Sequence, residues 1–399
     1  MNAKPSQHAL PIQENAKTFT TACIFAMTTS FQIPLFKVFM PDGIGESLAP
    51  VLHSGRLASG PQVAQFELEA ARWLGVERAA ALCDSSAALT LALYMSGVRP
   101  GDEVITSPLA CAATLMPIAN LFARPAWCDI DPATGMPTAA MIAKCITEKT
   151  RAILFYHWSG DVGETAEIAA LARRHNIKLI EDASEAFGAM TDGCRLGGIA
   201  DYTIYSFYAT KHINCGGDGA ILLAKDPDTI EIARNLRRFG IDPKGFRLQN
   251  GDLNPDFNIP VAGFNFAMNE IEAAIGRANL GQADNVVARQ QANGAFLDTA
   301  LAHITGVKLL NRRPGSRSAY WTYSLRVQRR DELIRKLTEH GIGAQRLHVR
   351  NDSYSCFPVT KAELPGVAVF DAENLSIPCG WWVTETQRTE IVRRIQDGW

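Results

Sequence analysis

The chain has 399 residues, of which 47% are hydrophobic and 20% are charged, and its formal net charge at pH 7 is −2. This length is enough for one large and one small domain, each with its own hydrophobic core. A net charge so close to zero argues against a nucleic-acid-binding or membrane-attracting surface. We therefore expect neither nucleic acid nor a membrane as a partner.

The nine cysteines are odd in number, and no two of them form a C-x-x-C pair. This pattern argues against a disulfide framework and a zinc knuckle, so we expect no metal site. It favours a reducing compartment, and we expect the protein in the cytoplasm. No run of eighteen apolar residues exists, and a short apolar patch at 22–27 is bordered by threonines. We interpret this patch neither as a signal peptide nor as a membrane span.

Residues 1–30 show no sustained hydrophobic period, and we expect a loosely attached extension there. The first clear element is a helix that Gly60 and Pro61 open and Gly75 closes, because proline suits the first helical turn and glycine the position after the last. The apolar side of this helix is formed by Val63, Phe66, Ala70 and Trp73.

A strand over 79–82 runs into a polar turn, Cys83-Asp84-Ser85-Ser86, which opens the next helix. Such a turn can bind a phosphate through its hydroxyls, its free backbone N–H groups and the helix dipole. It can also be an ordinary helix cap, which is the commoner role of Asp and Ser at this position. The local sequence leaves both interpretations open.

Strands and helices then alternate along the chain. We expect strands over 103–106, 126–128 and 152–156, and helices over 112–122, 138–146 and 164–175. Repeated βα units with short connections predict an α/β fold, with a mostly parallel sheet covered by helices on both faces. No G-x-G-x-x-G motif opens any of these helices, which argues against a dinucleotide-binding fold.

Three short apolar runs follow, at Leu179–Ile180, Tyr202–Phe207 and Ala220–Leu223, and we expect each to be a buried strand. Asp182 ends the first run, and Lys211 follows the second. An amine and a carboxylate at strand ends suit pyridoxal phosphate. A lysine holds the aldehyde of this cofactor as a Schiff base, and an acid keeps its ring nitrogen protonated. One Asp near one Lys is too common on protein surfaces to decide the matter alone.

We expect a helix over 227–239 and a loop rich in Gly, Asn and Pro over 241–263. Arg237 and Arg238 would lie in the last turn of this helix, where cations complement the helix dipole, and we assign them no function. The last hundred residues show an α+β rhythm, with strands near 307–310 and 320–327 and helices over 331–340 and 385–395. We therefore predict a large domain over 31–263, a connecting helical region over 264–305 and a small α+β domain over 306–399.

Several of these motifs together resemble the DegT family of sugar aminotransferases. They are Asp182-Ala-Ser-Glu185-Ala-Phe-Gly188, Ser206-Phe-Tyr-Ala-Thr-Lys211 with its glycine-rich turn, and Gly263-Phe-Asn265-Phe-Ala-Met268. The resemblance extends over roughly residues 36–399. It implies the large-domain, small-domain fold of type I pyridoxal phosphate enzymes. It also implies a homodimer in which each active site is completed by the other subunit.

The resemblance implies a role for each matching residue. Lys211 would form the Schiff base and Asp182 would contact the ring nitrogen, so both would be catalytic. The cofactor phosphate would be bound by Ser85, Ser86 and Ser206, and Asn265 would reach toward the phosphate across the dimer interface. In family members a substrate-side histidine often occurs where His348 lies, so His348 is a weak candidate.

Two cofactor-site positions depart from the family pattern. Cys111 stands where an aromatic ring usually stacks on the cofactor. Glu185 stands where many members have glutamine, although members that make perosamine-type sugars also have glutamate. The resemblance therefore places both residues beside the cofactor but does not define what they contribute.

Three functions compete for this chain. The resemblance favours an aminotransferase that transfers an amino group from an amino-acid donor, such as glutamate, to a nucleotide-linked keto-sugar. The alternatives are a cofactor-dependent sugar dehydratase, in which this family replaces the lysine with histidine, and a non-catalytic binding or regulatory protein on the same scaffold. Lys211 argues against both alternatives, since neither needs it. His212 follows directly, but the spacing from Ser206 puts Lys211 at the Schiff-base position.

Overall fold

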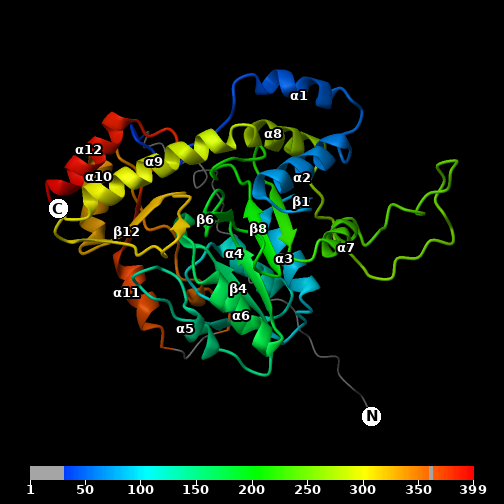
Figure 1. Cartoon of the computed structure of the whole chain (residues 1–399), viewed down its shortest axis with the longest axis horizontal. Coiled ribbons are helices and arrows are strands. Elements are labelled where there is room, and N and C mark those ends of the chain that lie inside the picture. The colour runs from blue at the N-terminus through cyan, green and yellow to red at the C-terminus, as the bar shows by residue number, and fades with distance from the viewer. Residues whose placement is uncertain (1–30, 359–362) are drawn as a thin grey trace, which may run out of the picture.

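The computed structural model describes residues 31–358 and 363–399. The extension expected over 1–30 lies outside these residues. Figure 1 shows a large body built on a central sheet, along which a long helix runs into a second, smaller region. The connection between α7 (Asp228–Leu236) and α8 (Glu270–Leu280) forms an arm that projects from the body at the right of this view. None of the helices in the described ranges is long and apolar enough to cross a bilayer.

The central sheet has seven strands. β9 is antiparallel to both of its neighbours, β1 and β8, whereas β8, β5, β4, β2 and β3 are mutually parallel. Parallel strands need crossover connections, and helices lie between successive strands from β2 to β5 in the sequence, whereas two short strands lie between β5 and β8. Across the sheet the order is β1 (Ala80–Leu82), β9 (Ala220–Ala224), β8 (Tyr202–Ser206), β5 (Lys178–Asp182), β4 (Thr150–Tyr156), β2 (Glu103–Thr106) and β3 (Arg124–Trp127).

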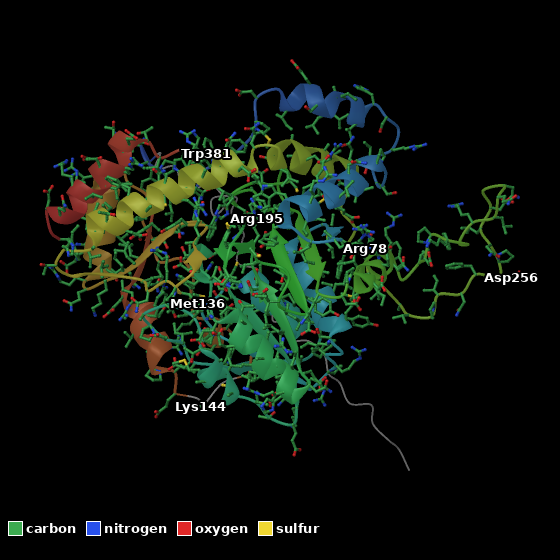
Figure 2. All side chains as sticks on the ribbon, viewed as in Figure 1. Arg78, Met136, Lys144, Arg195, Asp256 and Trp381 are labelled. Atoms are coloured by element: carbon green, nitrogen blue, oxygen red, sulfur yellow. The ribbon has the colours of Figure 1, made fainter. Side chains whose placement is uncertain are left out.

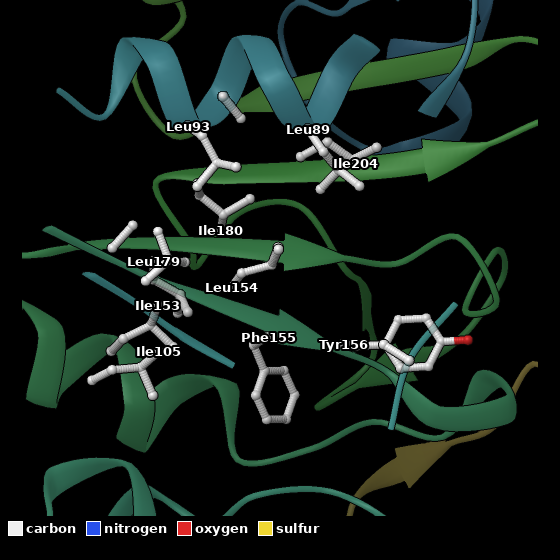
Figure 3. Packing of buried hydrophobic residues seen from close by; sticks show 14 of the residues in the cluster. Leu89, Leu93, Ile105, Ile153, Leu154, Phe155, Tyr156, Leu179, Ile180 and Ile204 are labelled. Atoms are coloured by element: carbon white, nitrogen blue, oxygen red, sulfur yellow. The ribbon is translucent and has the colours of Figure 1, made fainter. Parts of the chain in front are cut away.

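Both faces of this sheet are buried. On one face Leu89 of α3 (Ser85–Met95) lies beside Ile204 of β8, and Leu93 of the same helix points toward Ile180 of β5, as Figure 3 shows. The next residue of β8, Tyr205, belongs to a separate apolar cluster that contains Phe66 of α2 (Pro61–Leu74). Successive strand residues point to opposite faces, so β8 is covered on both sides. The remaining helices of this part are α1 (Ile44–Leu52), α4 (Ala112–Asn120), α5 (Ala139–Ala143), the 3-10 turn η2 (Trp158–Gly160) and α6 (Thr165–His175).

The carboxyl-terminal part has a core of its own, which includes Leu325, Leu375 and Ile391. The long helix α9 (Ala283–Leu301) leads into it (Figure 1). Its sheet has the order β10 (Val307–Leu309), β12 (Tyr323–Val327) and β13 (Asn374–Ile377). A further small sheet joins β6 (Met190–Thr191) and β7 (Cys194–Arg195) to β11 (Ser316–Arg317). The other elements are α10 (Arg330–Glu339), η3 (Asn351–Ser353), α11 (Pro365–Glu373) and α12 (Glu385–Gln396).

Candidate active site

The candidate site lies at the edge of the sheet where the parallel strands β4, β5 and β8 end. β5 ends at Asp182 and β8 at Ser206, and the two strands are neighbours, with Asp182 paired to Ile204. The chain then turns, and the backbone N–H of Lys211 donates to the carbonyl of Tyr208 over 2.9 Å. Open α/β sheets bind ligands outside the carboxyl ends of their strands. The topology therefore brings three of the predicted site residues to one edge.

Asp182 is buried at this edge and is only 1% exposed. Its carboxylate accepts a hydrogen bond of 2.7 Å from the hydroxyl of Thr114 and one of 2.9 Å from the backbone N–H of Ser184. Within 31–358 and 363–399, no Lys, Arg or His side chain forms an ion pair with it. A buried carboxylate without a counterion is costly, so this one is suited to a cationic group that the chain itself does not supply.

The neighbouring acid, Glu181, points away from this edge into the protein. It accepts hydrogen bonds from Thr165 over 2.7 Å and from Thr203 over 2.8 Å, and it pairs with His157 at 3.1 Å. Burial alone raises the pKa of Glu181, but His157 and the two threonines outweigh it and hold this pKa below its usual range. Glu181 is therefore satisfied within the protein, which leaves Asp182 as the acid that faces the site.

Lys211 is held between a carboxylate and an aromatic face. Its Nζ lies 3.7 Å from Oε1 of Glu185 and 3.7 Å from the centre of the Trp321 ring. The Lys211 side chain is 11% exposed, and that of Glu185 is fully buried. Trp321 is itself fixed, because it stacks on Phe36 at 5.0 Å and its indole N–H donates to the carbonyl of Thr210 over 2.9 Å. Both contacts are attractive for a protonated amine.

Ser85 and Ser86 form the first turn of α3, while Asp84 caps this helix by accepting the backbone N–H of Ala87 over 2.8 Å. The capping role therefore belongs to Asp84 and not to the serines. The hydroxyl of Ser86 donates to the carbonyl of Ala113 over 3.0 Å, which ties the start of α3 to the start of α4. Ser206 is buried, and its hydroxyl accepts the backbone N–H of Tyr208 over 3.2 Å. Hydroxyls at a helix N-terminus form a site suited to an anion.

Cys111 occupies the N-cap position of α4, three residues before Thr114. Burial raises the pKa of its thiol, nearby Glu185 and Asp182 act in the same direction, and Lys211 opposes them. The thiol therefore lies among the charged groups of the site and is protonated at neutral pH. Its position beside a cofactor stays a prediction.

Asn265 lies apart from this group of charged side chains. It is exposed, and its backbone pairs with that of Arg238, while Ala267 pairs with Leu82 at the end of β1. Within one subunit Asn265 is thus on the surface next to β1. Its contact with a cofactor across a dimer interface stays a prediction.

Comparison with known proteins identifies the family. A sequence model of the DegT/DnrJ/EryC1/StrS aminotransferase family matches residues 42–396. The chain belongs to this family. The crystal structure of the sugar aminotransferase CalS13 from Micromonospora echinospora is 34% identical and superposes with a TM-score of 0.87, covering 92% of this chain and 100% of that one.

Two named relatives of this DegT/DnrJ/EryC1/StrS aminotransferase are enzymes of sugar metabolism. GDP-perosamine synthase from Caulobacter vibrioides is 33% identical over 290 residues, which are 71% of this chain and 75% of the relative. The dTDP-3-amino-3,4,6-trideoxy-alpha-D-glucose transaminase of Streptomyces venezuelae is 29% identical over 358 residues, 88% of this chain and 90% of the relative. These similarities confirm the predicted family, α/β fold class and aminotransferase activity. Aminotransferases of this family use pyridoxal phosphate.

Sequence reasoning missed several residues that contact the predicted ones in this aminotransferase. Thr114 and Trp321 were not expected to contact Asp182 and Lys211, and Ser159 and Tyr156 were not expected near Glu185. Figure 3 shows Tyr156 at the end of β4, with its hydroxyl directed away from the strands. A polar residue at or just past the end of a parallel strand is the one signal that could have suggested Tyr156, His157 and Ser159.

Proposed function

We propose that this protein is a pyridoxal-phosphate-dependent aminotransferase that passes an amino group from an amino-acid donor to a keto-sugar. The observation that carries this proposal is that two complementary groups lie at the same edge of the sheet: Asp182, a buried carboxylate without a counterion in the described residues, and Lys211, a partly accessible amine. Both leave the carboxyl ends of adjacent parallel strands. An acid and an amine so placed suit the two ends of a protonated pyridine carbaldehyde.

The residues at this edge fit pyridoxal phosphate. Asp182 would pair with the ring nitrogen, Lys211 would hold the aldehyde covalently, and the phosphate would lie at the N-terminus of α3 near Ser85, Ser86 and Ser206. The hydroxyl of Ser184, two residues after Asp182, is buried and has no hydrogen-bond partner among the described residues, so it too can contact a bound group. When bound, the cofactor supplies an electron sink that makes a neighbouring C–H bond acidic.

The chain supplies the proton transfers. Lys211 Nζ is the basic group that can take a proton from one carbon of a bound substrate and return it to another. Its contacts with Glu185 and Trp321 limit the positions that this amine can adopt. Hydrogen bonds from Thr114 and Ser184 fix the position of the Asp182 carboxylate. Its negative charge is therefore already in place when a cationic group binds, and no rearrangement is needed.

The acceptor that we propose is a keto-sugar linked to a nucleotide, and the donor is an amino acid such as glutamate. The names of the two relatives contain GDP and dTDP, which describe those enzymes. We extend from them only the substrate class, a nucleotide-linked sugar. A panel of nucleotide-linked keto-sugars would identify the nucleotide and the sugar carbon that this chain selects.

We also propose that the protein works as a homodimer. The arm between α7 and α8 extends away from its own subunit, and Figure 2 shows Asp256 at its outer end. Several large apolar side chains in this arm are exposed: Leu248, Leu253, Ile259 and Val261. Exposed apolar groups on a projecting segment favour contact with another chain. Sedimentation should give about twice the 43.5 kDa mass of one chain, and an active monomer would contradict the dimer.

A product assay tests the amino transfer. The protein is incubated with pyridoxal phosphate, glutamate and a panel of nucleotide-linked keto-sugars, and the products are identified by mass spectrometry. We expect an amino-sugar and 2-oxoglutarate in equal amounts, and we expect Lys211→His to abolish this exchange. A deoxy-sugar without nitrogen as the main product of the unchanged protein would favour the dehydratase instead.

A further inference from the structure

We propose that Glu185 acts as an ionised carboxylate that holds a proton on Lys211, and that His348 and Tyr156 are positioning residues that keep Glu185 in this state. The contacts do not depend on a cofactor, but their purpose rests on the proposed role of Lys211 in amino transfer. Proton transfer by an amine depends on how firmly its surroundings hold that proton. The proposal therefore assigns a specific task to three residues around the lysine.

Three elements far apart in the sequence converge on Glu185. Oε2 accepts the backbone N–H of Ser159, in η2, over 2.8 Å. Oε1 lies 3.2 Å from Nε2 of His348, which the carboxyl-terminal part contributes, and 3.7 Å from Nζ of Lys211. The hydroxyl of Tyr156, at the end of β4, lies 2.9 Å from Nε2 of His348, and Tyr156 favours the charged form of the same carboxylate. A fully buried carboxylate with this many donors is stabilised in its charged form.

The contacts also fix which nitrogen of His348 carries a proton. Nε2 lies 2.9 Å from the Tyr156 hydroxyl and 3.2 Å from Glu185. A bare Nε2 would face the carboxylate oxygen as one acceptor facing another, which is repulsive. With a proton on Nε2, His348 can donate to the Tyr156 hydroxyl and to the Glu185 carboxylate. Both contacts are attractive in this arrangement, with Glu185 ionised.

His348 has little freedom to leave this position. Its ring packs edge-on against Tyr156 at 5.8 Å and against Trp158 at 5.5 Å. Its side chain is 12% exposed, whereas that of Glu185 is fully buried. An aromatic wall on two sides therefore holds the imidazole with Nε2 toward the carboxylate.

The charges around Glu185 agree with this assignment. Titratable groups from every neighbouring element lie near it: Cys111 at the start of α4, Tyr156 of β4, Asp182 after β5, Lys211 and His212 after β8, and His348. Burial raises the pKa of Glu185, but Lys211, His348 and Tyr156 together outweigh burial and hold this pKa below its usual range. The same carboxylate contributes to raising the pKa of Tyr156, after burial, so that the phenol keeps its proton as a donor.

The test measures how the reactivity of Lys211 depends on pH. The full-length chain, freed of cofactor, is labelled briefly with acetic anhydride at a series of pH values, and peptide mass spectrometry gives the acetylated fraction of Lys211. The midpoint is the pH at which the labelling of Lys211 reaches half of its maximum. An opposite charge within about 4–6 Å changes this midpoint by about one to three pH units. Glu185→Gln keeps the shape but removes the charge, so Lys211 should become reactive at a pH lower by about that amount.

His348 is tested through Glu185. His348→Leu removes one of the donors to Glu185, which makes the charged form of this buried carboxyl less favourable, so the midpoint should move in the same direction as in Glu185→Gln. His348→Gln retains a donor and should stay near the unchanged protein. The double variant Glu185→Gln/His348→Leu should match Glu185→Gln alone, because His348 has no other route to Lys211 in this account. His340→Leu, at the end of α10, is the matched control and should leave the midpoint unchanged.

Three results would overturn the proposal: an unchanged midpoint in Glu185→Gln, an unchanged midpoint in His348→Leu, or a further shift when the two changes are combined. Failure of the proposed function has a different signature. In that case borohydride reduction of the unchanged protein with pyridoxal phosphate leaves no cofactor on Lys211, whatever the labelling midpoints are.

Discussion

The hydroxyl of Thr114 donates a hydrogen bond of 2.7 Å to Oδ2 of Asp182, which joins the first turn of α4 to the end of β5. Thr114→Val keeps the shape of this side chain but leaves the buried carboxylate oxygen without its donor. Such a loss costs about 1–3 kcal/mol, so we expect cofactor affinity to fall by roughly tenfold or more. An absorbance titration with pyridoxal phosphate measures it. Thr114→Ser retains the hydroxyl and should bind pyridoxal phosphate almost as well as the unchanged protein. If Thr114→Val also bound it with unchanged affinity, the hydrogen bond from Thr114 to Asp182 would have no part in cofactor binding.

A change of Asp182 itself should impair the enzyme more than the change of Thr114. Asp182→Asn is isosteric, and a hydrogen bond to a charged group is worth about 1.5–3 kcal/mol. The loss of the electron sink adds to this, so we expect a folded protein that has lost most of its turnover. Steady-state rates, with circular dichroism as the folding check, measure it. Asp228→Asn, an exposed acid at the start of α7, is the control. Near-normal turnover in Asp182→Asn would mean that the acid has a structural role only.

Cys111 offers a test of what lies above the cofactor ring. A thiol in place of an aromatic side chain forgoes a stacking contact worth about 0.5–1.5 kcal/mol. Cys111→Phe should therefore tighten cofactor retention, or block the site sterically, while Cys111→Ala should change little. Cofactor release during gel filtration measures both variants. If neither substitution changes retention or rate, Cys111 does not contact the ring.

Acid stability depends on His212. Burial lowers the pKa of this imidazole from 6.5 to about 4, the carbonyl of Ala319 opposes the shift, and the charge of Lys211 adds to it. Between these two pH values the unfolded chain binds a proton that the folded chain does not. Stability is therefore fully present above pH 6.5 and falls as the pH drops toward 4, by about 3 kcal/mol in all.

Urea unfolding midpoints across this pH range check the effect of His212. His212→Gln has no group that titrates there, so its stability should fall less steeply on acidification than that of the unchanged protein. The comparison removes the contribution of the carboxylates, which both proteins share. Parallel pH profiles for the two proteins would show that His212 titrates in the folded state as it does in the unfolded one.

The sheet and the two reacting groups could be predicted because their signals are local. The apolar runs that became β5 and β8 are short and lie between polar residues, and Asp182 ends the first while Lys211 follows the second. The parallel topology then requires these ends to meet. Thr114 and Trp321 could not be predicted in the same way, since they lie 68 and 110 residues from their partners Asp182 and Lys211. Only the packed structure shows those distant contacts.

Local reasoning also misjudged some residues that it did consider. The helix expected to reach residue 239 ends at Leu236, and Arg237 forms an ion pair and hydrogen bond with the buried Glu67 of α2. Its charge thus neutralises a buried acid from another helix, a role that a helix-dipole argument does not contain. The predicted domain limits at 263 and 305 are not decided by these contacts and stay predictions.

The central claim is that Lys211 holds the cofactor, and one experiment tests it most directly. The full-length protein is saturated with pyridoxal phosphate, reduced with borohydride, digested and mapped by mass spectrometry. Reduction makes the link between amine and cofactor permanent, so we expect the added mass on the peptide that contains Lys211 and its loss in Lys211→Ala. A modified Lys178 or Lys225, with Lys211 unmodified, would contradict the account.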